Sequence, residues 1–356
     1  MVQRKPVNKK EEPKKEAEKK SPVSDEEDDE LINSIILDLN KKDPEAAMLL
    51  ESSTRAQVQG WIPSGDPEID RVLGGGWPLG RIVEVFGPES NGKTTVALHA
   101  AAECQKMGGV VVFLDNEHAL SKKRAKDIGV NLKKLIYSQP GTMEEVFEYV
   151  EGIVEKVTKV NSDRPILIVW DSVAASPAKA EIEGDYDDQF VGIHARIMSQ
   201  SLRKINKIIN HSKACFMCIN QTRDKVGVTF GEKSSTPGGK ALKFYASIRL
   251  EVVKIGQYKE GSAVAGIKCI ATAKKNKVAP PFGKADFNIL FAEDCAGIDG
   301  IGNVLDKGYD MGVFGESNGW YVLDEKKYRK ADARKYLKEN PEEFKKYYDT
   351  VTGAVN

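Results

Sequence analysis

A glycine-rich segment between residues 87 and 95 constrains the fold of this chain more than any other feature. It consists of Gly87, Pro88, Glu89, Ser90, Asn91, Gly92, Lys93, Thr94 and Thr95, and matches the pattern G-x-x-x-x-G-K-[ST]. An apolar run at residues 82–86 precedes it, and a helix-compatible stretch at residues 95–103 follows it. Glycines let backbone N–H groups turn inward around phosphate oxygens, and a helix N-terminus adds positive potential. The segment therefore predicts a strand, loop and helix that bind a nucleoside triphosphate.

Three side chains predict how phosphates and a metal ion are held. Lys93 is expected to reach the β- and γ-phosphates, and the Thr94 hydroxyl to hold Mg²⁺. An apolar run at residues 166–170 ends in Asp171, the place of a second carboxylate near Mg²⁺ in P-loop enzymes. The alternative for residues 87–95, a glycine turn with a surface lysine, is disfavoured by the flanking strand and helix.

Two further polar side chains follow predicted strands. Glu117 comes after the apolar run at residues 110–115, where it is placed to orient or deprotonate the water that attacks the γ-phosphate. Gln221 comes after the run at residues 215–219, where its amide can hydrogen-bond the γ-phosphate and sense its loss. Each residue alone could be a helix cap or a satisfied polar group. Together, at the same sheet edge as the glycine-rich loop, they predict nucleotide hydrolysis.

The fold class follows from alternating strand and helix patterns. Strands are expected at residues 82–86, 110–115, 135–138, 166–170, 215–220, 248–253 and 267–273. The central ones are continuous apolar runs, as expected of parallel strands buried on both faces. The sequence therefore predicts an α/β fold with a mostly parallel central sheet, whose ligands gather at the carboxyl ends of the strands.

Changes in composition divide the chain into four predicted parts. Residues 1–30 are Lys-rich and then acidic, which predicts a disordered charged tail. Residues 31–60 carry an apolar stripe at helical spacing, which predicts a helix and linker that dock on a partner or a neighbouring copy. Residues 61–296 form the predicted core. Residues 297–356 form a predicted small C-terminal α/β domain with a helical end at 326–348.

Composition limits the class of protein. With 40% hydrophobic and 30% charged residues, the chain is typical of soluble globular proteins. Apolar runs of membrane-span length and a signal peptide are absent, which favours the cytoplasm and no membrane partner. The five cysteines form no paired C-x-x-C sets, so buried reduced thiols are expected rather than zinc ligands. The net charge of zero gives no hint of nucleic acid, and the basic N-terminal arm either touches DNA or a partner or only aids solubility.

Two segments carry features suited to nucleic acid. The loop at residues 222–239 combines glycines with Arg223, Lys225 and Phe230, groups that suit tracking a nucleic-acid backbone and wedging between bases. The predicted helix at residues 193–211 places basic and polar groups on one face, namely Arg196, Ser199, Arg203 and Lys207. That face is either a phosphate track or an ordinary solvated surface.

Several motifs together resemble the bacterial RecA recombinase family. They are residues 87–95, 117–120, 171–175, 179–184, 219–221, 241–247 and 275–277, and the similarity covers roughly residues 60–345. The string at 241–247, Ala-Leu-Lys-Phe-Tyr-Ala-Ser, is far more specific than the glycine-rich loop. It separates the RecA family from helicases and clock proteins with the same core.

The resemblance implies an ATP-dependent filament on single-stranded DNA that pairs it with homologous duplex DNA, in recombinational repair and the SOS response. It implies that Mg²⁺ and ATP are held by Lys93, Thr94 and Asp171, that Glu117 activates water, and that Gln221 couples the γ-phosphate to the second DNA-binding loop. Matching DNA-contacting positions are Arg196, Ser199, Arg203 and Phe230. Matching positions that reach the ATP of an adjacent subunit are Lys275 and Lys277, with Phe244 coupling ATP to the interface.

The sequence also departs from the family pattern. Ser121 and Arg124 stand where the family carries an aspartate and a tyrosine that stacks on adenine, and the Arg124 guanidinium plane is expected to stack there instead. Two other functions share this core: a ring helicase, and a DNA-coating mediator whose ATPase times its release. Residues 241–247 and the pair Lys275 and Lys277 favour a recombinase over a helicase. Sequence alone does not separate the mediator.

Overall fold

The computed structural model describes residues 25–41, 46–53, 57–185, 190, 192–224, 234–260, 262–292, 296–314 and 319–353. The chain divides into two compact units, residues 1–56 and residues 57–356. Among the described residues, none of the helices is long and apolar enough to cross a membrane.

The described residues of the first unit include one helix, α1 (Asp25–Leu39). The prediction of a disordered tail up to residue 30 is wrong for residues 25–30, which form the start of this helix; residues 1–24 lie outside the described part. The acidic block explains the difference, because carboxylates in the first turn of a helix interact favourably with its dipole. The apolar side chains of Leu31, Ile35 and Leu39 on α1 are exposed.

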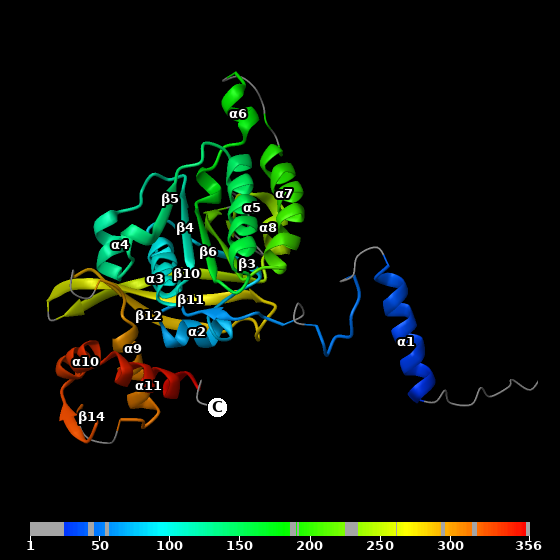
Figure 1. The fold of residues 1–356 in the computed structure, drawn as a ribbon. Helices are drawn as coiled ribbons and strands as arrows, with labels where there is room; N and C mark the ends of the chain where they lie inside the picture. The colour runs from blue at the N-terminus through cyan, green and yellow to red at the C-terminus, as the bar shows by residue number, and fades with distance from the viewer. Residues whose placement is uncertain are drawn as a thin grey trace, which may run out of the picture. The chain divides into compact units, whose positions relative to one another are not determined.

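The second unit is built on a nine-stranded sheet, shown in Figure 1, with the order β13-β12-β11-β10-β3-β7-β6-β4-β5. Its strands, in chain order, are β3 (Arg81–Gly87), β4 (Val110–Asp115), β5 (Leu135–Ser138), β6 (Ile166–Asp171), β7 (Ala214–Gln221), β10 (Ile248–Glu260), β11 (Ala263–Asn276), β12 (Lys284–Leu290) and β13 (Gly297–Ile298). From β10 to β5 all neighbours are parallel, and from β10 to β13 they are antiparallel. The predicted α/β fold with a mostly parallel sheet is confirmed.

Alternating side chains of the parallel strands fill two separate cores. On β4, Val111 and Phe113 point into one core with helix α3 (Lys93–Lys106). Val112 and Leu114 point into the other, with α5 (Met143–Val160) and α7 (Ile193–Asn210). Helices α5 and α7 lie side by side on their face of the sheet (Figure 1). Burial on both faces explains why these strands are continuous apolar runs.

The predicted strand boundaries fail mainly at β10 and β11. The sequence predicted residues 248–253 and 267–273, whereas the two strands form a long antiparallel hairpin from Ile248 to Asn276 with three register shifts. The outer part of β10, from Lys254 to Glu260, mixes charged and polar residues with apolar ones, so it does not show the continuous apolar pattern of a buried strand. Shorter elements complete the core: α2 (Pro67–Leu73), α4 (Lys122–Ile128), α6 (Lys179–Glu183), α8 (Gly239–Tyr245), and the two-stranded pairs β1 (Trp61–Ile62) with β2 (Trp77–Pro78) and β8 (Arg223–Asp224) with β9 (Ser234–Ser235).

The C-terminal segment has a core of its own, which includes Val304, Phe314 and Leu337. Its elements are α9 (Gly300–Asp310), β14 (Tyr321–Leu323), β15 (Lys326–Tyr328), α10 (Lys330–Glu339) and α11 (Pro341–Thr352). The predicted helical end at 326–348 is wrong at its start, since β15 pairs with β14 there. The main sheet extends to Ile298, two residues past the predicted end of the core. The division into four parts otherwise stays a prediction.

Candidate nucleotide site

The glycine-rich loop joins the end of β3 at Gly87 to the start of α3 at Lys93. Gly87 has a φ of 153°, and a Cβ there would lie 2.2 Å from the carbonyl oxygen of Val252. Gly92 has a φ of 90°, and a Cβ there would lie 2.2 Å from Cδ1 of Ile289. Both glycines are therefore required by backbone conformation and by close contact with β10 and β12.

Asn91 braces this loop against the neighbouring strand. Its Oδ1 accepts a hydrogen bond from the backbone N–H of Lys254 over 2.5 Å, and its Nδ2 donates to the carbonyl of Glu89 over 2.7 Å. The side chain is buried, so both bonds are shielded from water. The pattern placed Asn91 in the loop but did not predict this role, because Lys254 lies far along the chain.

Lys93 and Thr94 open α3 with their side chains in the loop. Lys93 Nζ donates to the Pro88 carbonyl over 2.7 Å, so its ammonium lies across the space that the loop encloses. Burial lowers the Lys93 pKa, against the nearby charges of Asp171, Glu117 and Glu89. A cation in this position is suited to phosphate oxygens.

Thr94 Oγ1 donates to Asp171 Oδ2 over 2.7 Å, which joins α3 to the end of β6. Burial raises the pKa of Asp171 to about 6, and Thr94 opposes that shift. A buried carboxylate beside a hydroxyl is a suitable partner for a divalent cation. Mg²⁺ usually binds one or two carboxylates plus substrate phosphates. Thr94 and Asp171 form an open pair, which fits Mg²⁺ shared with phosphates. Within the described residues there is no cluster of three or more His, Cys, Asp or Glu that could hold a metal ion.

Glu117 follows β4 and is held by two donors. Ser172 Oγ donates to Glu117 Oε1, and Gln221 Nε2 donates to the same oxygen over 2.8 Å. The ends of β4, β6 and β7 thus converge on one carboxylate. The sequence predicted Glu117 and Gln221 at this edge but missed Ser172; its position directly after Asp171 is the signal that could have found it.

Asn220 connects the end of β7 to buried charges and to the next loop. Its Nδ2 lies 3.1 Å from Glu84 Oε1 and 3.1 Å from the carbonyl of Pro237. Glu84, on β3, is paired with Arg249 on β10, with 2.5 Å between Oε2 and Nε. Because Asn220 precedes Gln221 directly, this network anchors the residue next to the predicted phosphate sensor. The sequence analysis assigned neither Glu84 nor Arg249.

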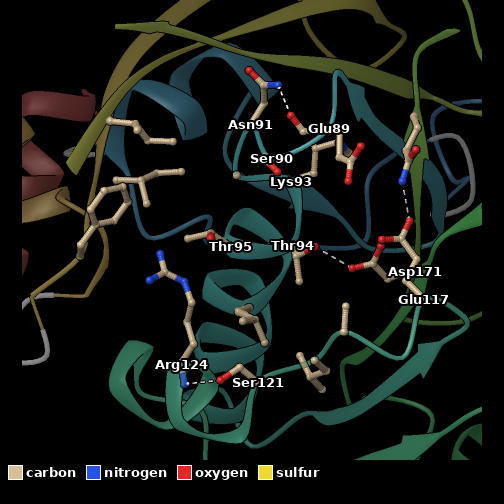
Figure 2. A pocket seen from close by; sticks show the side chains of 18 residues that line it. Glu89, Ser90, Asn91, Lys93, Thr94, Thr95, Glu117, Ser121, Arg124 and Asp171 are labelled. Carbon is tan, nitrogen blue, oxygen red and sulfur yellow. Dashed lines mark hydrogen bonds between the residues drawn. The ribbon is translucent and has the colours of Figure 1, made fainter. Parts of the chain in front are cut away.

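A cavity of about 410 Å³ extends from the loop between these groups and α4 (Figure 2). Its lining includes the predicted residues Glu89, Ser90, Asn91, Gly92, Lys93, Thr94, Thr95, Glu117, Arg124, Asp171 and Gln221. Figure 2 shows Arg124 and Ser121 on the side opposite Glu117 and Asp171. The lining also includes the apolar residues Leu98, Leu120, Ile267, Ile289 and Phe291. Sequence reasoning missed the last three, which reach the cavity only through the pairing of β11 and β12.

The residues predicted to contact DNA are only partly described. Arg196 and Arg203 are exposed on α7, and Ser199 lies between them with its hydroxyl donating to the Ala195 carbonyl over 2.8 Å. Arg223 begins the short strand β8, two residues after Gln221. Lys225 and Phe230 lie outside the described residues. The helix face therefore exists as predicted, and its role in binding stays a prediction.

Lys275 and Lys277 lie at the end of β11, away from the cavity just described. Lys275 Nζ donates to the carbonyls of Lys243 and Phe244, over 2.7 and 2.9 Å. Burial, with the charges of Lys277 and Arg249, lowers the Lys275 pKa to about 8. Lys277 Nζ is 5.8 Å from the centre of the Phe244 ring, and that side chain is 69% exposed. Neither lysine is among the described residues that line the nucleotide cavity of their own chain.

Comparison with known proteins decides the family. The family model described as RecA N-terminal domain matches residues 31–298. This chain belongs to the RecA family. Protein RecA of Bacillus subtilis strain 168 is 48% identical to it over 282 residues, which are 78% of each chain. Protein RecA of Heliobacterium modesticaldum is 46% identical over 306 residues, 86% of this chain and 84% of the relative. Protein RecA of Bacillus velezensis is 46% identical over 304 residues, 83% of this chain and 85% of the relative.

Membership establishes the general activity. As a member of the RecA family, the chain is a DNA-dependent ATPase that uses ATP and Mg²⁺, forms helical filaments on single-stranded DNA and catalyses strand exchange with homologous duplex DNA. It acts in recombination and repair of DNA in the cytoplasm. The predicted family, cofactors, partners and reaction are thereby confirmed. Family membership does not by itself assign roles to individual residues.

Proposed function

We propose that the residues at the carboxyl ends of β3, β4, β6 and β7 form one ATP-hydrolysing site that drives recombination by this chain. The hydrogen bond from Gln221 Nε2 to Glu117 Oε1, 2.8 Å long, carries the proposal. It places the predicted general base and the predicted γ-phosphate sensor in direct contact. A site that only bound nucleotide would need neither group.

Each of the remaining side chains has a distinct task in hydrolysis. The loop N–H groups and Lys93 bind the β- and γ-phosphates, with Asn91 keeping the loop in shape. Thr94 and Asp171 would hold Mg²⁺, whose charge would offset the negative charge that develops on the phosphates. Glu117 accepts the proton of the attacking water. Ser172 and Gln221 fix the Glu117 carboxylate, so little reorganisation is needed when the proton moves.

Gln221 is also suited to transmit nucleotide state to DNA. It ends β7, and the segment that carries Arg223, Lys225 and Phe230 begins directly after it. Asn220 bonds to Pro237 at the other end of that segment. The Gln221 amide can exchange its hydrogen bond to Glu117 for one to a γ-phosphate. Because Gln221 directly precedes the segment, we propose that this exchange also moves the DNA-binding groups of the segment. Arg196, Ser199 and Arg203 on α7 add a second DNA-contacting face.

Lys275 and Lys277 are proposed to act on the nucleotide of an adjacent subunit. Their place outside their own cavity and beside the exposed Phe244 ring supports that proposal. The exposed apolar stripe of α1 is proposed to dock on a neighbouring core, so that residues 31–60 link successive subunits. Both contacts would make filament assembly dependent on ATP through mass action.

Strand exchange between circular single-stranded DNA and homologous linear duplex DNA, with ATP and Mg²⁺, tests the function. Joint molecules are expected with the homologous duplex and not with a heterologous one. ATP hydrolysis on single strands without joint molecules would instead indicate a motor or a mediator.

A mixing experiment tests the action in trans. Lys93→Ala and Lys275→Ala proteins are each expected to lack DNA-dependent ATPase activity. Mixed in equal amounts they are expected to regain part of it, since an intact loop on one subunit meets an intact lysine on the next. A mixture as inactive as its components would contradict the assignment of Lys275.

A further inference from the structure

The nucleotide cavity has two chemically different ends. The carboxylates and the amide sensor, namely Glu117, Asp171 and Gln221, line one end together with the glycine-rich loop. Arg124 lies at the other end, where Figure 2 shows its guanidinium extending from α4 into the cavity toward Thr95. A nucleotide whose γ-phosphate faces Glu117 must direct its base toward Arg124.

The cavity has an apolar wall, and its base end has a single ionisable side chain. The wall is made by Ile267 and Ile289, both buried, and by Phe291, which is 50% exposed; Ile289 also lies against Gly92 of the loop. Such a surface packs against the flat face of any purine. Among the described side chains that line this end, Arg124 alone carries a charge, and no hydrogen bond or ion pair to a described residue engages its guanidinium.

The Arg124 guanidinium offers donors only. A guanidinium has five N–H donors and no acceptor, and it keeps its charge in proteins although burial lowers the Arg124 pKa. The Ser121 hydroxyl oxygen accepts the backbone N–H of Arg124 over 3.3 Å, which leaves its proton to donate and one lone pair to accept. Guanine offers two adjacent acceptors, O6 and N7, that match a guanidinium in a bidentate contact. Adenine offers N7 and an amino group, so one N–H donor of the guanidinium would face the N–H donors of that amino group.

We infer that the base end of this site accepts guanine as well as adenine, which makes GTP a second nucleotide for the recombinase. ATP packs its base between the apolar wall and the guanidinium plane. With GTP the guanidinium lies instead in the plane of the base, where it donates to O6 and N7, while the base keeps its contact with the apolar wall. The inference rests on the proposed site, because it requires the phosphates to lie in the glycine-rich loop.

Calorimetric titration of the full chain with ATP and with GTP, each with Mg²⁺, tests the inference in the Glu117→Gln variant, where slow hydrolysis permits equilibrium. The two Kd values are expected to lie within about tenfold of each other, the usual scale of one good bidentate base contact. Arg124→Leu is expected to weaken GTP binding by about tenfold and ATP binding by less than about threefold. Arg124→Lys keeps the charge but loses the planar fork, so it should also weaken GTP selectively.

The control is Lys122→Leu, which removes an exposed cation from the same helix outside the cavity and should change neither Kd. A GTP Kd more than about tenfold above the ATP Kd overturns the inference, as does an Arg124→Leu variant that loses both nucleotides equally. If ATP supports strand exchange while GTP does not bind, only this inference fails. If neither nucleotide binds, the proposed site itself is wrong.

Discussion

Gln221 Nε2 donates a hydrogen bond to Glu117 Oε1 over 2.8 Å and thereby joins the ends of β7 and β4, which are not neighbours in the sheet. Between them lies β6, and Ser172, the residue directly after that strand, donates to the same carboxylate oxygen. In the proposed mechanism, hydrolysis and sensing therefore depend on one shared carboxylate. Any change that moves Gln221 also changes the hydrogen bonding of the base.

Replacing Glu117 with glutamine should separate binding from hydrolysis. The amide keeps the volume of the side chain but cannot take a proton, so DNA-dependent ATPase activity should fall by about 10²- to 10⁴-fold. Nucleotide-dependent binding to single-stranded DNA should persist, because Lys93, Thr94 and Asp171 are untouched. Phosphate release and filter binding measure the two effects. Glu155→Gln, on the exposed face of α5, serves as control and should change neither.

Shortening Gln221 to alanine should uncouple ATP from DNA. The variant keeps the phosphate loop, so its ATP affinity should stay within about tenfold of the original, since one neutral hydrogen bond contributes about 0.5–1.5 kcal/mol. ATP should no longer raise affinity for single-stranded DNA, because the anchor of residues 222–239 has lost its contact with the γ-phosphate. DNA affinities measured with ATP and with ADP would reveal this. An undiminished difference between the two nucleotides would show that Gln221 is not the sensor.

The sequence alone was enough to predict the place of a site residue where that residue directly follows one buried strand. Glu117, Asp171 and Gln221 each follow a buried apolar run, and parallel strands bring their carboxyl ends to one edge. Contacts between distant strands left no such local signal. Ile289 lies against Gly92, and Lys254 bonds Asn91, only because β10, β11 and β12 fold beside the loop.

Errors in secondary structure have a related cause. Residues 25–30 were expected to lack structure because an acidic block resembles a disordered tail, yet the same charges suit the first turn of α1. Lys326–Tyr328 have a charged, helix-like composition, but they pair with Tyr321–Leu323 as a strand. In both places local composition permitted two structures, and position within an element or pairing with another segment decided between them.

Gly92→Ala should abolish nucleotide binding for a steric reason. The added Cβ would lie 2.2 Å from Ile289 Cδ1, at a φ of 90°. Gly108→Ala is the matched control, with a φ of 76° and nothing within 4 Å of its Cβ. Both variants should lose about 1–2 kcal/mol of stability from the left-handed backbone. Only Gly92→Ala should lose ATP binding in titration calorimetry, and equal losses in both variants would exclude the steric explanation.

The last prediction concerns pH and the buried carboxylate of Asp66. This side chain caps α2, accepting the N–H groups of Glu68 and Ile69 over 3.0 Å each, and it also accepts a hydrogen bond from Asn303 on α9. Burial raises its pKa from 3.8 to about 7. Since the native state favours the protonated form, this stabilisation is complete below about pH 4 and is lost as pH rises through about 7.

The melting temperature should therefore fall as pH rises from 5 to 8, by about 5 °C if Asp66 dominates. Asp66→Asn should reduce that fall without loss of the cap, because asparagine and aspartate cap helices about equally well. Part of the fall should remain, because burial also raises the pKa of Asp70 to about 6. Asp332→Asn, an exposed position on α10, should leave the profile unchanged. Calorimetric scans at several pH values measure the slope, and a variant with the original slope would show that Asp66 does not titrate in this range.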